Sequence, residues 1–171
     1  MTRFGFREFK KEGTRFHVNG QPTFLRGTLE CCIFPLTGYP AMANSNWEKI
    51  YRTCKEFGLN HVRFHSWCPP EAAFNVADSM GIYLQVECGA WATVGDGGYI
   101  DQWLYEEGDR ILKEYGNHPS FCMMAYGNEP IGANQAQYLS DLVAYWKQHD
   151  NRRVYTSAGG WTYIENAAYW N

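Results

Sequence analysis

The residues of this sequence best suited to acid–base chemistry lie where an uncharged, mostly apolar run ends. Residues 121–126 carry no charge, and Gly127, Asn128 and Glu129 follow them directly. Such a run is typical of a strand buried on both faces. A carboxylate just past that strand lies at the edge where α/β enzymes place catalytic groups, so Glu129 is a candidate proton donor. A Gly-Asn turn with a solvated glutamate explains these few residues equally well when they are taken alone.

Polar and aromatic side chains follow the other predicted strands in the same way. They are Arg26 after the first strand, Arg63 and His65 at the second, Trp67 beyond it, Glu87 and then Trp91 after the third, and Trp161 after the fifth. In a parallel sheet or barrel these ends share one edge, so the residues would line one pocket. Aromatic residues make up 17% of the chain, and their flat faces suit a sugar ring.

Each of these residues also has an ordinary structural explanation. The arginines could pair with acids such as Glu30 or Glu71, a semi-buried histidine is common, and tryptophans pack well in cores. Independent structural residues would be spread over both ends of the strands, whereas these share one end. Their shared position therefore favours a binding site.

Four helices are predicted between the strands from apolar residues at helical spacing. They span residues 47–57, 70–80, 100–115 and 138–146. Ser45 and Glu48 are expected to form a capping box for the first helix, which Gly58 ends. The second helix starts at a proline, Pro70, and stops at a glycine, Gly81.

Short runs of β-favouring residues separate the helices. These predicted strands are 23–25, 61–64, 82–86, 121–126 and 154–156, and a hairpin with its turn at Glu12 and Gly13 is expected over residues 6–18. The alternation indicates right-handed crossovers and a parallel sheet. Two α/β architectures fit it: a complete doubly wound sheet of the flavodoxin type, or the first five strands of a (β/α)8 TIM barrel, whose full form has about 250 residues.

Composition and charge exclude several classes of partner. An apolar content of 45% with 19% charged residues is ordinary for a soluble globular protein. The net charge is −3 and the basic residues are scattered, so no nucleic-acid partner is expected. No apolar run reaches the roughly 18 residues of a membrane span, and residues 1–5 show no signal region, so no membrane partner is expected and the compartment stays open.

No cofactor or metal is expected. The six cysteines, at positions 31, 32, 54, 68, 88 and 122, include no Cys-x-x-Cys pair and have no histidine at zinc-binding spacing. We interpret them as reduced, structural thiols. Residues 95–98 are rich in glycine but lack the lysine and the serine or threonine of a phosphate loop, and are interpreted as a flexible loop.

Four segments, in order, resemble the catalytic barrel of glycoside hydrolase family 2, the group of β-galactosidases, β-glucuronidases and β-mannosidases. They are residues 16–27, 58–65, 77–87 and 127–129, so the resemblance covers nearly the whole chain. It implies that residues 1–20 are a leading hairpin and linker after a β-sandwich domain. Residues 21–171 would be the first five strands of the barrel.

The resemblance also implies a retaining glycosidase acting on a carbohydrate. Glu129 would be its general acid/base, and Asn128 would hydrogen-bond the sugar's 2-hydroxyl group. Arg26, Arg63, His65 and Glu87 would shape the pocket. In this family the nucleophile comes from the seventh strand, so the chain is expected to be a fragment that is inactive alone and able to self-associate through its open barrel edge.

Some residues depart from the family's commoner pattern. These are residues 28–32 after the first strand, residues 65–70 after the second, and Met124 where a tryptophan often precedes the Asn-Glu pair. The departures indicate a divergent branch. A non-catalytic carbohydrate-binding or pseudoenzyme module is the alternative function, and a flavodoxin-like binding domain is the alternative fold.

Overall fold

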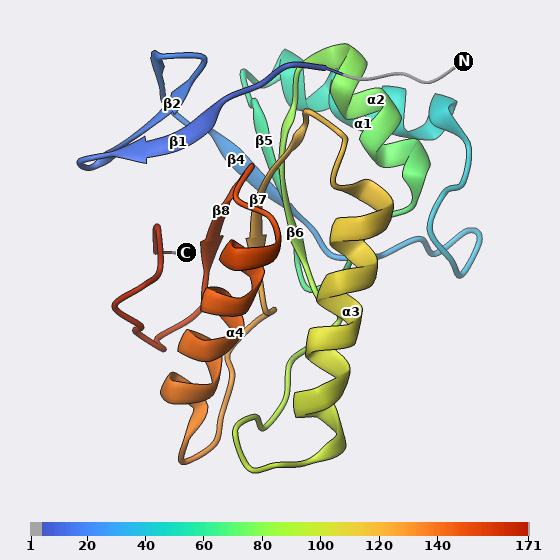
Figure 1. Cartoon of the computed structure of the whole chain (residues 1–171). Coiled ribbons are helices and arrows are strands. Elements are labelled where there is room, and N and C mark those ends of the chain that lie inside the picture. Colours follow the sequence, from blue (N-terminus) through green and yellow to red (C-terminus); the bar gives the residue numbers. More distant parts are fainter. Residues whose placement is uncertain (1–4, 171) are drawn as a thin grey trace.

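In the computed structural model, which describes residues 5–170, five parallel strands form one sheet (Figure 1). The strands are β4 (Gly27–Glu30), β5 (His61–Phe64), β6 (Tyr83–Glu87), β7 (Phe121–Ala125) and β8 (Val154–Thr156), and they pair in chain order. A doubly wound sheet reverses its strand order at a switch point, whereas a barrel adds every strand on the same side. The fold is therefore a partial (β/α)8 barrel, and the flavodoxin-like alternative is wrong.

Four helices connect successive strands and lie along the outer face of the sheet (Figure 1). They are α1 (Asn44–Glu56), α2 (Glu71–Met80), α3 (Tyr99–Tyr115) and α4 (Gln135–His149). The capping box expected for the first helix is wrong. Ala43 occupies the N-cap without a side-chain bond, and Ser45 lies inside the helix. The proline start and left-handed glycine end of α2 are as expected, with φ of 68° at Gly81.

A small antiparallel sheet precedes the barrel strands. The expected hairpin is confirmed as β1 (Phe9–Glu12) and β2 (Arg15–Val18), with its turn at residues 13–14 rather than 12–13. A third strand, β3 (Gln21–Thr23), pairs with β2. The first barrel strand was expected at residues 23–25 and is found at β4 instead. Residue composition identified this segment as a strand but could not identify the strand with which it pairs. Thr23 pairs with Phe16 of β2 and not with a strand of the barrel. Residues 1–4 and 171, which belong to the two expected domains, lie outside the described residues.

The core has two parts, one on each face of the sheet. Residues of all four helices pack against the outward side chains of the strands, with Trp47, Phe64, Phe74 and Trp146 fully buried. A smaller cluster on the inner face joins Phe9 of the hairpin to Cys122, Met123 and Val154. Because those residues lie near the amino ends of β7 and β8, the hairpin covers that end of the inner face and leaves the carboxyl ends open.

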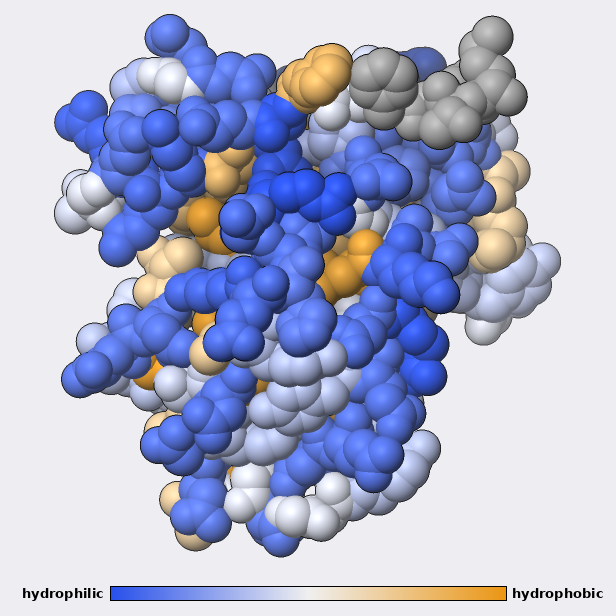
Figure 2. Space-filling model, viewed as in Figure 1, coloured by the Kyte–Doolittle hydropathy of each residue, from blue (hydrophilic) through white to orange (hydrophobic). Residues whose placement is uncertain are grey.

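The molecular surface follows the same division. In Figure 2, hydrophilic side chains cover most of the visible face of α3 and α4, and apolar patches lie beneath the hairpin. Strand β4 has no second neighbour among residues 5–170. On β8, the amide of Ala168 donates to the Tyr155 carbonyl at 2.8 Å, so the chain's own last residues partly cover that edge. Self-association through an open edge stays a prediction.

Helices α3 and α4 approach closely at one glycine. A Cβ at Gly108 would lie 2.2 Å from Nε1 of Trp146, a fully buried indole. We expect Gly108→Ala to lower the free energy of unfolding by about 1 to 3 kcal/mol, because overpacking outweighs the gain of up to about 1 kcal/mol in helix propensity. Urea denaturation followed by tryptophan fluorescence measures it. Gly89→Ala, where the nearest side-chain atom would be 3.9 Å away, is the matched control, and equal midpoints for both variants would contradict the packing argument.

A buried charge cluster joins the end of α4 to the start of β8. Asp150 accepts hydrogen bonds from Nη2 of Arg152 at 2.7 Å and Nη2 of Arg153 at 2.8 Å. Burial acts to raise the pKa of Asp150, but the hydrogen bonds from Arg152 and the charge of Arg153 outweigh it and hold the pKa at about 2. A carboxyl group whose pKa is depressed on folding stabilises the protein above its unfolded pKa and loses that contribution as the pH falls through its folded pKa.

We therefore expect stability to fall between about pH 4 and pH 2 as this carboxylate is protonated. Asp150→Asn should unfold about 2 to 4 kcal/mol more easily at neutral pH, since it leaves the buried Arg153 without its counter-charge. Between about pH 4 and pH 2, the free energy of unfolding of this variant should also fall by less than that of the wild type. Urea midpoints measured at several pH values give both quantities, and an unchanged acid dependence in the variant would exclude Asp150 as its source.

Candidate active site

The carboxyl ends of three neighbouring strands bring the candidate residues together. Arg63 of β5 pairs in register with Gln85 of β6, and Glu87 of β6 pairs with Ala125 of β7. Asn128 and Glu129 follow β7 after the turn at Gly127. The parallel register therefore places side chains from residues 63 to 129 at one edge of the sheet.

A buried ion pair lies at the base of this site. Nε of Arg63 donates to Oε1 of Glu87 at 2.6 Å, and Nη2 lies 3.3 Å from Oε2. Glu87 is 0% exposed, and Gln85 Nε2 donates to the same Oε1 at 2.9 Å. A buried carboxylate is tolerated only when its oxygens are paired and hydrogen-bonded, as here. Glu87 is therefore a fixed counter-charge for Arg63.

Arg63 in turn orients two further side chains. Its Nη2 donates to Oδ1 of Asn128 at 2.9 Å and lies 3.3 Å from Nδ1 of His65. A guanidinium group can only donate, so it selects the amide oxygen of Asn128 and the unprotonated nitrogen of His65. The Asn128 amino group and the His65 Nε2–H are then directed elsewhere, as potential donors to a ligand.

Glu129 is held through its backbone while its carboxylate stays free. Its amide donates to the Gly159 carbonyl at 2.7 Å, and the Gly159 amide donates to the Gly127 carbonyl at 2.9 Å. Its φ of 40° is in the left-handed region, which is uncommon for a residue other than glycine and is concentrated at functional sites. The carboxylate makes no hydrogen bond or ion pair with any of residues 5–170. It is partly exposed and available to a ligand.

Gly159 makes the close approach of β8 possible. A Cβ there would lie 2.2 Å from Nη2 of Arg63 and 2.7 Å from Oδ1 of Asn128. Any side chain would therefore separate the two groups that Arg63 joins. The segment after β8 is part of the site through its backbone rather than through a polar side chain.

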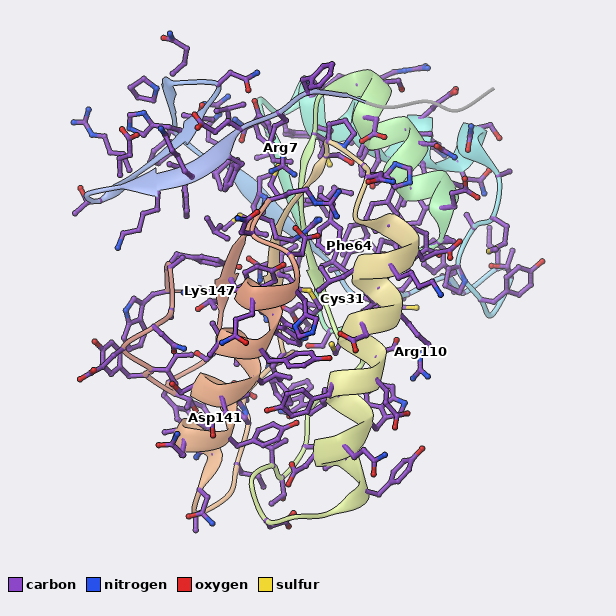
Figure 3. All side chains as sticks on the ribbon, viewed as in Figure 1. Arg7, Cys31, Phe64, Arg110, Asp141 and Lys147 are labelled. Atoms are coloured by element: carbon purple, nitrogen blue, oxygen red, sulfur yellow. The ribbon has the colours of Figure 1, made fainter. Side chains whose placement is uncertain are left out.

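A cavity of about 380 Å³ opens beside these residues. Its lining residues are Cys31, His65, Ser66, Gly89, Ala90 and Trp91. Trp91 is 64% exposed, and its ring meets the His65 ring edge-on at 5.5 Å between centroids. An exposed indole beside polar groups is suited to stacking on a sugar ring. All six cysteines are free, but Cys31, labelled in Figure 3, and Cys32 are exposed, so these two do not pack as structural thiols.

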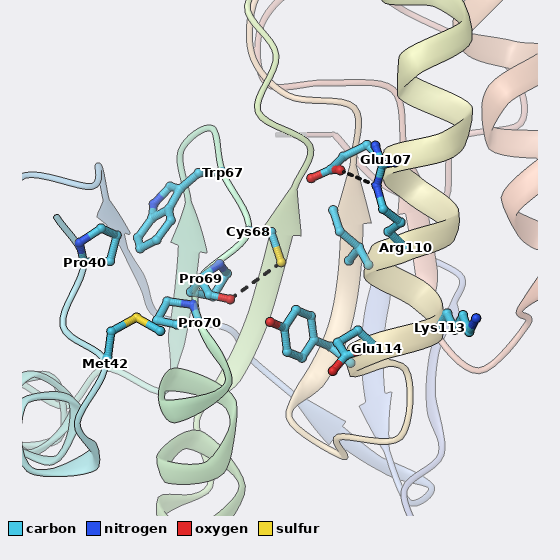
Figure 4. A pocket seen from close by; sticks show the side chains of 12 residues that line it. Pro40, Met42, Trp67, Cys68, Pro69, Pro70, Glu107, Arg110, Lys113 and Glu114 are labelled. Carbon is cyan, nitrogen blue, oxygen red and sulfur yellow. Dashed lines mark hydrogen bonds and ion pairs between the residues drawn. The ribbon is translucent and has the colours of Figure 1, made fainter.

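Two of the expected site residues lie elsewhere. Arg26 precedes β4, and its Nε donates to the Gly58 carbonyl at 2.6 Å, which places it at the amino end of the sheet. Its assignment followed from the misplaced first strand. Trp67 packs on Phe64 and Trp47 on the helix side. It lines a larger cavity of about 620 Å³ next to α3, shown in Figure 4, which contains none of the other candidates.

Trp161 is 65% exposed and directly follows Gly160, at which an added Cβ would lie 3.2 Å from Cγ of Glu129. The structure thus groups Arg63, His65, Glu87, Trp91, Asn128 and Glu129, with Trp161 adjacent along the chain. Sequence reasoning missed Gln85, Cys31 and Gly159. The Gly159-Gly160 pair just after a predicted strand was a usable signal, because paired glycines there indicate close backbone approach.

The described part of the chain contains neither a cluster of metal-ligating side chains nor a helix that could span a membrane. No three or more His, Cys, Asp or Glu residues are arranged to hold a metal ion there. None of the helices over residues 5–170 has the length and apolar character needed to span a membrane.

The chain resembles known glycosidases over most of its length. The family model for the glycosyl hydrolases family 2 TIM barrel domain matches residues 9–168. A β-glucuronidase of Bacteroides fragilis is 28% identical over 77% of this chain and 21% of its own length, and a β-galactosidase of Thermoanaerobacterium thermosulfurigenes is 28% identical over 98% and 23%. The chain thus spans about a fifth of these curated relatives.

Solved structures share the fold. The β-glucuronidase of Parabacteroides merdae has a TM-score of 0.76 at 23% identity, over 90% of this chain and 20% of its own. A β-galacturonidase of Eisenbergiella tayi, bound to galacturonate, has a TM-score of 0.79 at 22% identity, over 91% and 29%. With the family model matching residues 9–168, the chain belongs to glycosyl hydrolase family 2, within its TIM barrel domain.

Proposed function

We propose that this chain carries the proton-donating side of the active site of a retaining glycoside hydrolase, with Glu129 as general acid/base. The observation that carries the proposal is the free carboxylate of Glu129, which follows Asn128 in the chain. The side chain of Asn128 is oriented by its hydrogen bond from Arg63. The names of the relatives support a β-linked glycoside as the substrate class.

In the first step Glu129 protonates the oxygen of the scissile bond as it leaves the anomeric carbon. The bond electrons go to that oxygen, and a second carboxylate attacks the anomeric carbon from the opposite side to form a glycosyl-enzyme ester. Glu129 then removes a proton from water, which displaces the ester and regenerates both carboxyl groups. Asn128 donates its free amino hydrogen to the 2-hydroxyl group, and Trp91 stacks against a sugar ring.

The second carboxylate is not Glu87. Its oxygens are occupied by Arg63 and Gln85, and it is 0% exposed. A retaining mechanism places the two carboxyl groups about 5 to 5.5 Å apart across the scissile bond, with both open to the sugar. We infer that the nucleophile belongs to a part of the complete enzyme outside this chain, which spans about a fifth of its curated relatives.

Replacing the proton donor tests this assignment. In the complete polypeptide, Glu129→Gln should lower kcat by about a hundredfold or more for substrates with poor leaving groups, and by less for activated aryl glycosides that depart without protonation. Steady-state kinetics on a matched pair of substrates measures the difference. Glu165→Gln, at an exposed carboxylate, is the control, and an equal loss for both leaving groups would remove the acid/base role.

The isolated 171-residue chain should not turn over aryl β-glycosides, because it offers Glu129 without an opposing nucleophile. Release of nitrophenol from a panel of nitrophenyl β-glycosides measures this, with circular dichroism to verify folding. Clear hydrolysis by the purified chain would show that the second carboxylate lies within it. If the complete polypeptide also binds sugars without hydrolysing any of them, the non-catalytic binding module becomes the better description.

A further inference from the structure

The hydroxyl group of Tyr126 is hydrogen-bonded to both main-chain groups of a single residue in a neighbouring loop. It accepts a hydrogen bond from the Ala92 amide at 2.9 Å and donates to the Ala92 carbonyl at 3.1 Å. Tyr126 itself is 0% exposed. A buried tyrosine hydroxyl needs a partner, but satisfying both main-chain groups of one residue fixes the position of that residue on both sides of its Cα. Ala92 directly follows Trp91.

A second tie holds the residue on the other side of Trp91. The Asn128 amide donates to the Ala90 carbonyl at 3.1 Å. Gly127, with φ of 155°, lies so close that an added Cβ would be 2.1 Å from that carbonyl oxygen. The residues flanking Trp91 are thus bonded to the residues flanking Gly127. Since Glu129 follows on the same short segment, the indole and the proton donor share one rigid support.

The rest of the loop is also anchored. The Asp101 carboxylate accepts hydrogen bonds from the amides of Gly95 at 2.9 Å and Gly97 at 2.8 Å, and the Val94 amide donates to the Ile131 carbonyl at 2.9 Å. The glycine-rich loop expected to be flexible is therefore held at both ends. Gly89, Ala90 and Trp91, which line the cavity, therefore belong to a loop that hydrogen bonds hold in place.

We infer that Tyr126 is a positioning residue of the sugar-binding site, which holds the Trp91 ring at a set place relative to Glu129. The inference rests on the proposed function, because it takes the Trp91 face as a sugar-stacking surface. Tyr126 does not touch the substrate or the reacting atoms. Its contribution is to substrate binding, through Trp91, and not to proton transfer.

Tyr126→Phe keeps the ring in the core and removes only the oxygen. The Ala92 amide then loses its partner, while the Ala92 carbonyl keeps the Ile131 amide at 3.3 Å. An unpaired amide draws the loop toward solvent and lets the Trp91 ring move. In the complete polypeptide we expect KM for an aryl β-glycoside to rise about tenfold, with kcat within about twofold and the pH profile unchanged.

Two comparisons separate positioning from general loss of stability. In a Trp91→Ala background, Tyr126→Phe should change KM by less than about twofold, because the group through which it acts is gone. Tyr155→Phe, which removes a buried hydroxyl that donates to the Asp150 carbonyl away from the site, should leave KM unchanged at a similar melting temperature. A full effect of Tyr126→Phe without Trp91, or a loss confined to kcat, would overturn the inference.

Hydrogen exchange at the Ala92 amide gives a readout that does not depend on turnover. Exchange in a peptide covering residues 90–95 should accelerate in Tyr126→Phe and not in Tyr155→Phe, and unchanged protection would overturn the inference. If the wild-type polypeptide hydrolyses no glycoside, the proposed function fails. The exchange rate then still decides whether Tyr126 holds this loop.

Discussion

The site depends on one buried charge pair, Arg63 with Glu87. A carboxylate without solvent exposure is stable as an ion only because the guanidinium and Gln85 occupy its oxygens. The same constraint gives Arg63 a fixed direction, and its remaining donor then determines how Asn128 and His65 are oriented. Removing either charge would leave the other buried and unpaired. The orientation of the Asn128 and His65 side chains therefore follows from this pair.

The backbone provides a second level of order above this pair. The loops that follow β6, β7 and β8 are joined by main-chain hydrogen bonds. The Asn128 amide donates to the Ala90 carbonyl, and the Glu129 amide donates to the Gly159 carbonyl. Glycines stand where these chains come closest, and the left-handed φ of Glu129 is held by the same bonds. Such bonding restricts motion where loops usually move. Polar side chains can then be left without partners, ready for a ligand.

Much of the fold was predictable because its signals are local. The strands at 61–64 and 154–156 and the helix between Pro70 and Gly81 follow from periodicity and end residues, and the parallel order follows from their alternation. The assignment of Arg26 to the site was wrong because the residues before it favour a strand in either sheet. Only the pairing of Thr23 with Phe16 places that strand in the hairpin sheet. The Arg63 network and the Tyr126 bond were beyond sequence reasoning, since they join residues 24 to 65 positions apart through side-chain direction.

The inner face of the sheet is apolar at the amino ends of the strands and polar toward their carboxyl ends. The packed core and the candidate site therefore occupy opposite ends of this face. At the amino ends Phe9 of the hairpin packs on Met123 and Val154 as a small apolar core. In the middle Tyr169 donates to Gln85 at 3.0 Å, which leaves the amide nitrogen of Gln85 for Glu87. Burial raises the pKa of Tyr169 well above its ordinary value, so this phenol stays a donor. The buried charge of Glu87 is thus supported by a series of hydrogen bonds from Tyr169 through Gln85, beneath the free carboxylate of Glu129.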